Sequence, residues 1–447
     1  MAIHEILFES FVQIGTSFGN YIKAIGGRDP DGNAKALALD QNGNLQVGIA
    51  DTGRLDAFGR LRVSNLRPIF DIQNEYDESP FSWETDLTGS ATITHDDNKS
   101  SVNLSTTTAS GDKVIRQTKQ YFRYQPGRSQ LILLTGVIGA QKSGVRKRLG
   151  YFDDNNGLFF EQVYSATAGE SFKVARRTNT SGSAVDSEFL QKNWNLDKLD
   201  GSGPSGINLD LTKTQIVVIE FQWLGVGRVR FGFDIDGKII YCHELLHANN
   251  ETEVYMRTPN LPLRYELENT GATASPTSLV QICSLVASED GQNHLEQPGL
   301  IFSGGNRASL ITCSARRPIF SIRLKTLFKS LTNRGIVVPL GASFYASAAS
   351  FFEIILNGTL TGASFSSYGT DSLIEYDIAA TSISGGTHVS SAYAEKAGAS
   401  NLQEEISSKI PLVLNMSGSA SDVLSIVAEP LSGNADCGGA VTWKEIY

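Results

Sequence analysis

TQIVVIEFQWLGVGRVRFGFDIDGKIIYCHELL, residues 214–246, is the stretch that decides the fold. It consists of short runs of alternating apolar residues, separated by glycines or by an Asp-Gly pair. This pattern is typical of consecutive antiparallel strands. Asp236-Gly237 predicts a two-residue type I′ turn, because both central positions of that turn have positive φ. The turn sets a register in which Phe233 pairs with Ile240.

This register divides the predicted hairpin into two faces. Phe231 pairs with Cys242, and Arg230 pairs with His243. We expect the apolar face to be core and the charged face to meet solvent, as in a sandwich of antiparallel sheets. The expected core side chains are Val229, Phe231, Phe233, Ile235, Ile240 and Cys242, and the expected outward side chains are Arg230, Asp234 and His243.

Similar runs recur along the chain. Residues 122–139 read FRYQPGRSQLILLTGVIG, residues 146–160 read RKRLGYFDDNNGLFF, and further alternating runs lie between 351 and 446. The chain has 447 residues, 40% hydrophobic and 19% charged, so we expect a globular protein of two or three domains. The 43 glycines suit an all-β protein with many tight turns.

A short repeat marks the expected domain boundaries. Arg67-Pro68-Ile69-Phe70 recurs as Arg317-Pro318-Ile319-Phe320, and proline is tolerated at the first position of a strand. We interpret each copy as the start of a β-domain. The predicted fold is all-β: an extended N-terminal arm at 1–65, a large antiparallel β-sandwich at 66–315 and a C-terminal antiparallel β-sandwich at 316–447.

The predicted arm contains a second repeat. The pattern D-x-x-G-x-L-x-V occurs at 40–47 and again at 56–63, sixteen residues later. Each copy reads as a turn followed by a very short strand, although two unrelated hairpins would also explain it. Burial of so few apolar side chains is worth less than the entropy of ordering the segment, so we expect the arm to be ordered only against another chain. The predicted assembly residues are Leu45, Val47, Leu61 and Val63.

Net charge, the N-terminal residues and the cysteines limit the expected partners, targeting segments and disulfides. The net charge is −9 and no long basic run is present, so nucleic acid and acidic membranes are not expected partners. Glu5 and Glu9 interrupt the first twenty residues, and we expect neither a signal peptide nor a membrane span. The four cysteines lie far apart without a CxxC pair, which favours core thiols over a disulfide framework.

Two stretches raise the question of a metal. Asp153-Asp154-Asn155-Asn156-Gly157 is rich in oxygen ligands, and Asp153, Asp154 and Asn156 are candidates for Ca²⁺. The stretch departs from an EF-hand loop, and an Asx-Gly turn between strands explains it without metal. Cys242-His243 with His247 is a candidate for Zn²⁺, but adjacent residues on a strand point to opposite faces. We expect no metal and no cofactor.

The sequence gives little indication of catalysis. It contains no H-E-x-x-H, and Gly225-Val226-Gly227 lacks the spacing of a phosphate loop. The sequence does not exclude a pair of catalytic carboxylates for glycoside hydrolysis, because two acidic residues on one face of a sandwich can lie close together. Most aromatic residues alternate with polar residues and are expected in the core. Trp194, in a loop-rich stretch, is the candidate for contact with a glycan.

Several long blocks resemble structural proteins of tailed bacteriophage particles. They are LDAFGRLRVSN (55–65), RPIFDIQ (67–73), YQPGRSQLILLTGVIG (124–139), RLGYFDDNNGLFF (148–160), the stretch 199–233 and TWKEIY (442–447). The resemblance implies a non-enzymatic virion protein that contacts other virion proteins, such as a tail, baseplate or capsid-surface component. It also implies a homotrimer.

The resemblance leaves alternatives open. The middle domain also resembles a jelly-roll or lectin-type sandwich, but a fold alone does not license a claim of sugar binding. One alternative is a tail adhesin that binds a glycan of the host surface. Another is a glycan depolymerase, although no long β-helical repeat is present.

Overall fold

The computed structural model describes residues 55–62, 65–164, 172–290, 298–395 and 411–447 in full. It also describes the backbone of β1 (Ser10–Gln13), β2 (Tyr21–Ala24), β3 (Gly26–Arg28), β4 (Ala34–Ala36) and β32 (Gly398–Leu402). The chain divides into two compact units, Met1–Thr52 and Gly53–Tyr447.

The first unit contains two short antiparallel pairs. β1 pairs with β2, and β3 pairs with β4. The first copy of the D-x-x-G-x-L-x-V repeat lies outside the described residues, so the predictions for Leu45 and Val47 are untested. Val63 of the second copy is also outside them.

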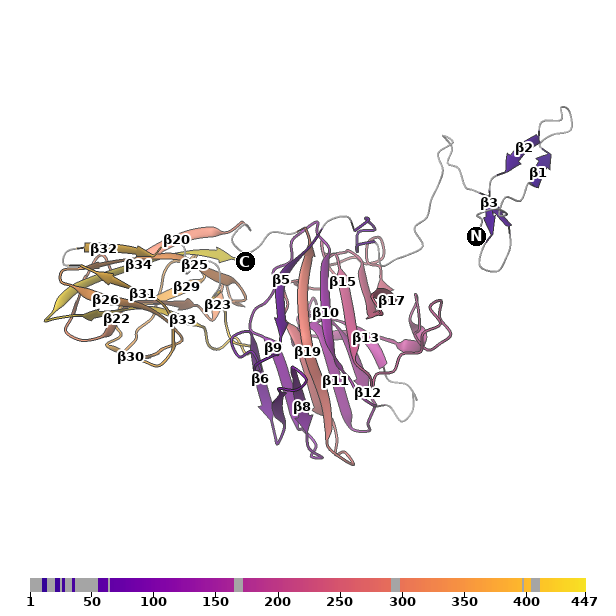
Figure 1. Cartoon of the computed structure of the whole chain (residues 1–447), viewed down its shortest axis with the longest axis horizontal. Helices are drawn as coiled ribbons and strands as arrows, with labels where there is room; N and C mark the ends of the chain where they lie inside the picture. The colour runs from indigo at the N-terminus through magenta and orange to yellow at the C-terminus, as the bar shows by residue number, and fades with distance from the viewer. Residues whose placement is uncertain are drawn as a thin grey trace. The chain divides into compact units, whose positions relative to one another are not determined.

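The second unit begins with a large sandwich of two antiparallel sheets (Figure 1). In the described part of the chain, sheet 1 has the order β17-β16-β15-β10-β19-β8-β7, with β5 paired to β19, and sheet 2 has the order β14-β13-β12-β11-β18-β9-β6. The strands of sheet 1 are β5 (Leu66–Gln73), β7 (Thr92–Asp96), β8 (Ser101–Thr106), β10 (Gln130–Val137), β15 (Gln215–Phe221), β16 (Val229–Ile235), β17 (Lys238–Leu245) and β19 (Thr277–Glu289). Those of sheet 2 are β6 (Trp83–Thr88), β9 (Lys113–Thr118), β11 (Val145–Phe152), β12 (Gly157–Val163), β13 (Phe172–Thr178), β14 (Val185–Leu190) and β18 (Leu263–Asn269).

A C-terminal sandwich follows, again made of two antiparallel sheets. Its first described strand begins at Leu300, so the boundary predicted at 315/316 from the Arg-Pro-Ile-Phe repeat is wrong: the second copy starts a strand inside this sandwich, not the sandwich itself. Sheet 3 has the order β20-β34-β25-β32 with β21 paired to β34, and sheet 4 has the order β28-β29-β22-β33-β26-β31. The strands of sheet 3, besides β32, are β20 (Leu300–Gly305), β21 (Ile311–Cys313), β25 (Ile336–Ala346) and β34 (Ala435–Ile446). Those of sheet 4 are β22 (Arg317–Leu324), β26 (Ser350–Leu356), β28 (Ser366–Ser367), β29 (Ile374–Asp377), β31 (Thr387–Ala394) and β33 (Val423–Pro430), while β23 (Leu327–Phe328) pairs with β24 (Leu331–Thr332) and β27 (Thr359–Thr361) with β30 (Ser382–Ser384).

The prediction of an all-β chain with antiparallel sandwiches is therefore confirmed. Each sandwich has its own hydrophobic core, one drawn from residues between 83 and 286 and the other from residues between 313 and 443. Within the described residues, no helix is long and apolar enough to cross a membrane.

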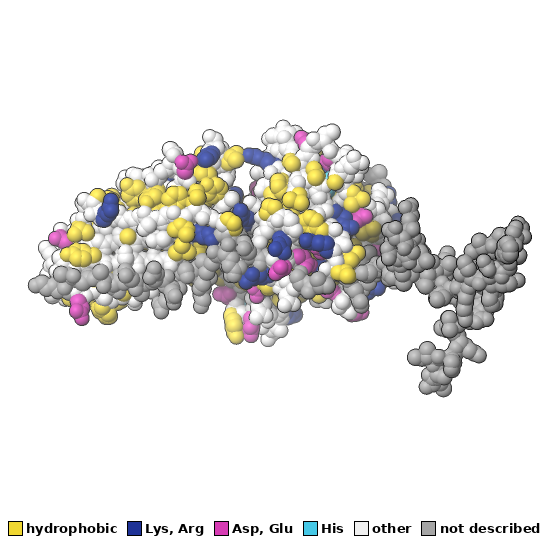
Figure 2. Space-filling model, turned by 90° about the horizontal axis from the view of Figure 1, so that it is seen from above, with side chains coloured by type: hydrophobic (Ala, Val, Ile, Leu, Met, Phe, Trp, Pro, Cys, Tyr) yellow, Lys and Arg dark blue, Asp and Glu magenta, His cyan; other side chains and the backbone are white. Residues whose placement is uncertain are grey.

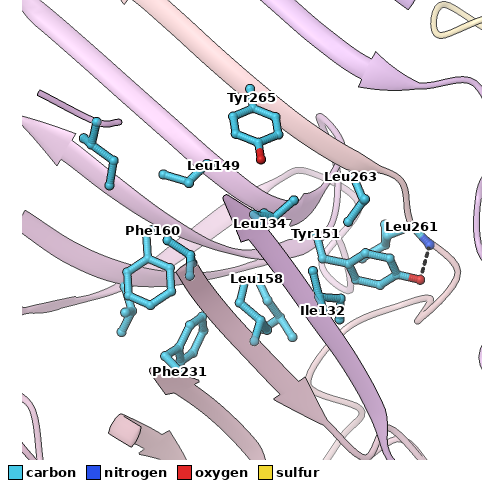
Figure 3. Packing of buried hydrophobic residues seen from close by; sticks show 14 of the residues in the cluster. Ile132, Leu134, Leu149, Tyr151, Leu158, Phe160, Phe231, Leu261, Leu263 and Tyr265 are labelled. Atoms are coloured by element: carbon cyan, nitrogen blue, oxygen red, sulfur yellow. Dashed lines mark hydrogen bonds between the residues drawn. The ribbon is translucent and has the colours of Figure 1, made fainter. Parts of the chain in front are cut away.

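The core of the large sandwich forms where the inner faces of sheets 1 and 2 meet (Figure 3). Phe160 of sheet 2 packs edge to face against Phe231 and Phe233 of sheet 1, with ring centroids 5.6 and 5.1 Å apart. The buried hydroxyl of Tyr151 accepts a hydrogen bond from the backbone N–H of Leu261 at 3.1 Å. A polar group this deep is stabilising only when it is hydrogen-bonded.

The Arg-Pro-Ile-Phe repeat forms the same local structure twice. One copy lies at the start of β5 and the other begins β22. In both, the register shifts between the proline and the phenylalanine, so that Ile69 and Ile319 are the extra residues of a β-bulge. A bulge leaves one residue unpaired and bends the strand.

The predicted hairpin is confirmed near its turn. Asp236 and Gly237 have φ of 54° and 77°, as a type I′ turn requires. Phe233 pairs with Ile240, and Phe231, Phe233 and Cys242 are all fully buried.

Beyond Gly232 the predicted register is wrong. A β-bulge between Phe231 and Gly232 places His243, rather than Cys242, opposite Phe231, and places Glu244 opposite Arg230. Arg230 and His243 were expected to face solvent, yet only 2% and 4% of their surfaces are exposed. Arg230 is buried because another segment of the chain covers it, as described below.

Candidate functional site

The face of sheet 2 that points away from the core carries a row of alternating charges. In the register of the sheet, Lys173 pairs with Glu161, Glu161 with Arg148, and Arg148 with Glu266. These side chains come from the adjacent strands β13, β12, β11 and β18. All four residues are more than nine-tenths buried. We call the set Arg148, Glu161, Lys173, Arg264 and Glu266 the charged face.

Charges of opposite sign are paired across this face. Lys173 Nζ lies 2.8 Å from a Glu161 oxygen and 2.7 Å from Glu188. Arg148 donates to the other oxygen of Glu161 and lies 3.4 Å from Glu266. Pairing of this kind offsets the cost of removing charges from water.

The pairing favours the charged forms of Glu161 and Lys173. Burial would raise the pKa of Glu161, but Arg148 and Lys173 outweigh it, and the pKa lies below its usual value. Burial would likewise lower the pKa of Lys173, but hydrogen bonds to Glu161 and Glu188 raise it. A general acid in glycoside hydrolysis needs a raised pKa so that it holds a proton at neutral pH. Glu161 is therefore unsuited to that role.

Aromatic rings lie beside the charged face. Phe152 and Phe159 are fully buried, with centroids 4.6 Å apart. The guanidinium groups of Arg148 and Arg177 lie 5.4 and 5.2 Å from the Phe159 ring, and Arg264 lies 5.3 Å from Phe152. These distances fit cation–π contacts, which stabilise rings and cations together.

Sheet 1 carries a different polar cluster on its outer face. Glu220 is fully buried, and its carboxylate lies 2.6 Å from both Arg62 and Arg230. It also accepts hydrogen bonds from Ser129 Oγ at 2.8 Å and from the Tyr241 hydroxyl. We call Arg62, Ser129, Glu220, Arg230 and Tyr241 the Glu220 clamp.

The Glu220 clamp holds the segment Leu55–Arg62, which we call the hook. Arg230 donates to the Leu55 carbonyl at 2.6 Å. Arg228 donates to the carbonyls of Asp56 at 3.0 Å and Ala57 at 2.9 Å. The hook is therefore bound to sheet 1 mainly by hydrogen bonds to its backbone and by the Arg62–Glu220 ion pair.

The local structure of the hook follows from its sequence. Asp56 Oδ1 accepts the Arg60 backbone N–H at 2.8 Å, and Gly59 has a φ of 77°. Leu55 and Leu61 then form an antiparallel bridge. The predicted turn is thus confirmed for this copy of the repeat, while the predicted short strand is, in the described residues, a single bridge at Leu61.

The hook corrects the predicted arm. Residues 53–65 were assigned to an arm ordered only by other chains, but Gly53 begins the second compact unit and the hook binds sheet 1 of its own chain. The expectation failed because it considered only apolar side chains, whereas Arg62 forms an ion pair with a buried carboxylate. Leu61 is 50% exposed, and its assignment to an assembly interface stays a prediction.

Trp194 does not lie where the glycan prediction needs it. Only 3% of its surface is exposed, and its ring packs against Phe160 and Phe172 at 6.3 and 5.7 Å. Its Nε1–H donates to the Phe189 carbonyl at 3.1 Å. A ring buried in the core cannot stack on a sugar, so this prediction is corrected. The loop-rich stretch folds back onto the core instead of standing free.

The calcium candidates are engaged by protein groups. Asp153 Oδ1 accepts the backbone N–H groups of Asn155 and Asn156 at 2.8 Å each, which is an Asx turn. Asp154 forms an ion pair with Arg264 at 2.6 Å, and Asn156 accepts the N–H of Arg257 at 3.1 Å. Over the residues with described side chains, no group of three or more His, Cys, Asp or Glu is placed to hold a metal ion.

The zinc candidates likewise do not converge. Cys242 is in the core, and its thiol donates to the Phe231 carbonyl at 3.3 Å. His243 Nδ1 accepts the Asn195 N–H at 3.2 Å, and its ring packs on Phe189. His247 Nδ1 bonds the Gly227 carbonyl at 2.6 Å.

The sequence analysis missed the Glu220 clamp and the charged face. Glu220 is the one acid in the apolar run QIVVIEF, and a carboxylate in such a run is a signal for a buried partner of opposite charge. The charged face had a weaker signal, since only Glu266 lies between two apolar residues, while Arg148 follows Lys147 and Glu161 precedes Gln162. Only the strand order, which local sequence does not encode, places them side by side.

Comparison with known proteins adds likenesses of fold. No family model matches the chain, and no curated protein does. Among solved structures, the legume lectin-like domain from Entamoeba histolytica is 9% identical, with a TM-score of 0.30, and the match covers 50% of this chain and 98% of that one. The CBM2 module of the evolved Dit of Lactobacillus casei BL23 phage J-1 is 8% identical, with a TM-score of 0.34 and coverage of 51% and 99%. A Bacteroides ovatus mixed-linkage glucan GH16 protein is 12% identical, with a TM-score of 0.33 and coverage of 48% and 99%.

Proposed function

We propose that this protein is a non-enzymatic structural component of a tailed bacteriophage particle, placed on the exterior and attached through its N-terminal residues. The blocks at 55–65, 124–139 and 199–233, which resemble phage virion proteins, are the starting point. The all-β architecture of two sandwiches after a separate N-terminal unit suits a stable exterior part. Charges of both signs are interspersed on the surface seen in Figure 2, which suits a protein surrounded by water.

The hook is the observation that carries this proposal. It contains LDAFGRLR, the start of the first block of the resemblance, and it lies directly after the boundary between the two compact units. The Glu220 clamp fastens it to sheet 1 through buried, charge-assisted bonds. An attached appendage needs such a firm connection between the segment that attaches it and the body that projects.

We further propose that the protein is a homotrimer whose copies meet through residues 1–52. The strands described in this unit are three or four residues long, and such short strands are marginal alone. Closed symmetry would supply identical partners for them. The trimeric number itself follows from the resemblance. Sedimentation equilibrium of the full chain checks it, and a monomer at micromolar concentration contradicts it.

A specific observation favours a second candidate function, binding of a host-surface glycan. An aromatic pair on sheet 4, the exposed Tyr393 beside the half-buried Phe351, is the feature that supports it and is described in the next subsection. The third candidate, a glycan depolymerase, would need a protonated general acid, and Glu161 does not provide one because its carboxylate is paired with two cations. We propose no catalytic residue.

Particles of the encoding phage provide the test. Purified by density gradient, they should contain peptides of this chain at a constant ratio to the major capsid protein. Antibody raised against residues 53–447 should label a fixed place on intact particles in electron micrographs. Finding the chain only in the fraction of the lysate that does not sediment with particles would overturn the proposal.

A further inference from the structure

Among the described residues, the outer face of sheet 4 is covered at one end only. Along β26, Phe352, Ile354 and Leu356 point into the core. The alternate residues Phe351, Glu353 and Ile355 therefore lie on the outer face. At the Ile355 end, the pair β27–β30 covers this face, since Ile383 and Leu360 pack on Ile355. The Phe351 end carries no such cover among the described residues.

An aromatic pair lies at the Phe351 end. Tyr393 of β31 is the direct cross-strand partner of Phe351, and 70% of its surface is exposed. The two ring centroids are 4.8 Å apart, and the ring planes are inclined at 48°. Phe351 is half-buried, so the two rings form one continuous apolar surface rather than a single exposed ring, and contiguous apolar surface is what marks a binding site. Because both rings stand on paired strands, they are held in place before any ligand arrives.

Polar groups surround the pair. Glu429 of β33 is the partner of Phe351 on its other side and is exposed. In the next row, Ser391 is exposed beside Glu353. The Glu353 carboxylate lies 2.6 Å from Arg316 and 2.8 Å from His388. The rim therefore offers carboxylate and hydroxyl oxygens that accept hydrogen bonds and guanidinium and imidazole groups that donate them.

We propose that Phe351 and Tyr393, with Glu429 and Ser391, form a binding platform for a neutral polysaccharide. The apolar face of a pyranose ring matches the aromatic surface, and its hydroxyls, which both donate and accept, match the mixed rim. Glu353 is balanced by its cationic partners, but Glu429 adds a negative charge, which disfavours a polyanionic glycan. An apolar protein surface would bury the exposed Glu429 and Ser391 without offering them hydrogen bonds, at a cost.

Affinity electrophoresis of the full chain tests this proposal. The gels contain dextran, soluble starch, hydroxyethyl cellulose or galactomannan as neutral probes, and polygalacturonate or hyaluronan as anionic probes. We expect retardation by at least one neutral polysaccharide. Tyr393→Ala should weaken that binding at least tenfold, and Glu429→Ala should weaken it severalfold. Tyr76→Ala removes a side chain that is 85% exposed on the large sandwich, so it serves as the matched control and should bind as the wild type does.

Three outcomes overturn the proposal. They are no retardation by any neutral probe, retardation by anionic probes only, and unchanged binding by Tyr393→Ala. Thermal melts of each variant establish that it is folded, and Tyr393→Phe, which keeps the ring, should retain most of the binding. Sedimentation of Tyr393→Ala tests whether the ring instead contacts another copy of the protein. If this variant loses self-association but binds the glycan as well as the wild type does, the ring belongs to a protein interface. Glycan binding by the platform does not require that the protein be part of a phage particle. The binding experiment and the particle experiment therefore have independent outcomes.

Discussion

Glu220 illustrates how one buried charge organises its surroundings. Fully enclosed, a carboxylate is costly unless opposite charges and hydrogen-bond donors meet it. Arg62 and Arg230 supply the charges, and Ser129 and Tyr241 supply hydroxyl donors. Burial and the adjacent carboxylate raise the pKa of Tyr241, so its hydroxyl keeps the proton that it donates.

Replacing this carboxylate tests its role. Glu220→Gln keeps the shape but leaves Arg62 and Arg230 without their shared anion. We expect the free energy of unfolding of the large sandwich to fall by about 3–5 kcal/mol, as for other broken buried pairs. Urea denaturation measures it, and limited proteolysis should show faster cleavage near residues 53–65.

Glu188→Gln is the matched control. Glu188 also pairs with a cation, Lys173, but its side chain is 44% exposed, so the loss should be below about 1 kcal/mol. Equal stability of the two variants would mean that the Glu220 clamp does not stabilise the hook.

His243 predicts a pH dependence of stability. Burial lowers its pKa from 6.5 to about 4. Between these values the unfolded chain binds a proton that the folded chain does not, so the free energy of unfolding falls as pH falls from 6.5 towards 4. Above pH 6.5 this contribution is fully present. Denaturation at pH 7, 5.5 and 4.5 measures it.

His243→Gln should make that fall smaller, because the amide does not titrate while its oxygen can still accept the Asn195 N–H. If the wild type and the variant lose stability in parallel, His243 is not the group responsible. Carboxylates that lose their charge at lower pH would then account for the loss.

At the scale of elements, the hairpin shows what local sequence can predict. The Asp236-Gly237 turn has its own φ requirement, so the turn and the first pairs after it follow from the residues themselves. The bulge at Phe231 does not follow in this way: Gly232 lies beside it, but a single glycine in a strand does not specify that Cys242 is the extra residue. The burial of Arg230 depends on the hook, which lies far away in the sequence. The alternation of residues therefore predicts which face of the sheet carries Arg230, but not that the hook covers that face.

The candidate sites were less predictable for the same reason. Trp194 lies among loop residues, and nothing local reveals that the loop folds onto Phe160 and Phe172. The DDNNG turn was predictable, because Asx side chains bond to nearby backbone groups. Phe351 and Tyr393 are far apart in the sequence, and only the pairing of β26 with β31 brings them together.

Replacing Gly150 tests how closely the strands of the charged face are packed. It lies between Phe159 and Arg264 in the register of sheet 2. A Cβ there would lie 2.4 Å from the Leu158 carbonyl oxygen and 2.6 Å from Phe159 Cβ. Gly150→Ala should therefore cost about 1–3 kcal/mol through overpacking, measured by urea denaturation.

Gly369→Ala is the control, because a Cβ at that position meets nothing within 4 Å. It should change stability by no more than about 0.5 kcal/mol. A neutral Gly150→Ala would show that strands β11 and β12 adjust more freely than the packing implies.

For the whole molecule, the repeats in the sequence were more informative than its composition. The two Arg-Pro-Ile-Phe copies each begin a strand of a separate sandwich and share a bulge, which a four-residue match alone could not establish. Strand order in the sheets stayed beyond the sequence, since pairing such as β10 with β19 joins segments far apart. The order of the strands depends on which apolar faces can be buried against one another, and this is a property of the complete chain.

Two truncations separate attachment from stability. Deleting residues 1–52 removes the first unit but keeps the hook, so the melting temperature of the large sandwich should be unchanged while incorporation into particles is lost. Deleting residues 1–62 also removes Arg62 and the carbonyls that Arg228 and Arg230 bind. The loss of a few kcal/mol should lower the melting temperature of that sandwich by roughly 5–10 °C, given about 2–4 °C per kcal/mol for domains of this size. Calorimetry and particle purification measure the two effects. If the two truncated proteins have the same melting temperature, the hook does not stabilise the sandwich. If the protein lacking residues 1–52 is still found in particles, these residues are not the attachment segment.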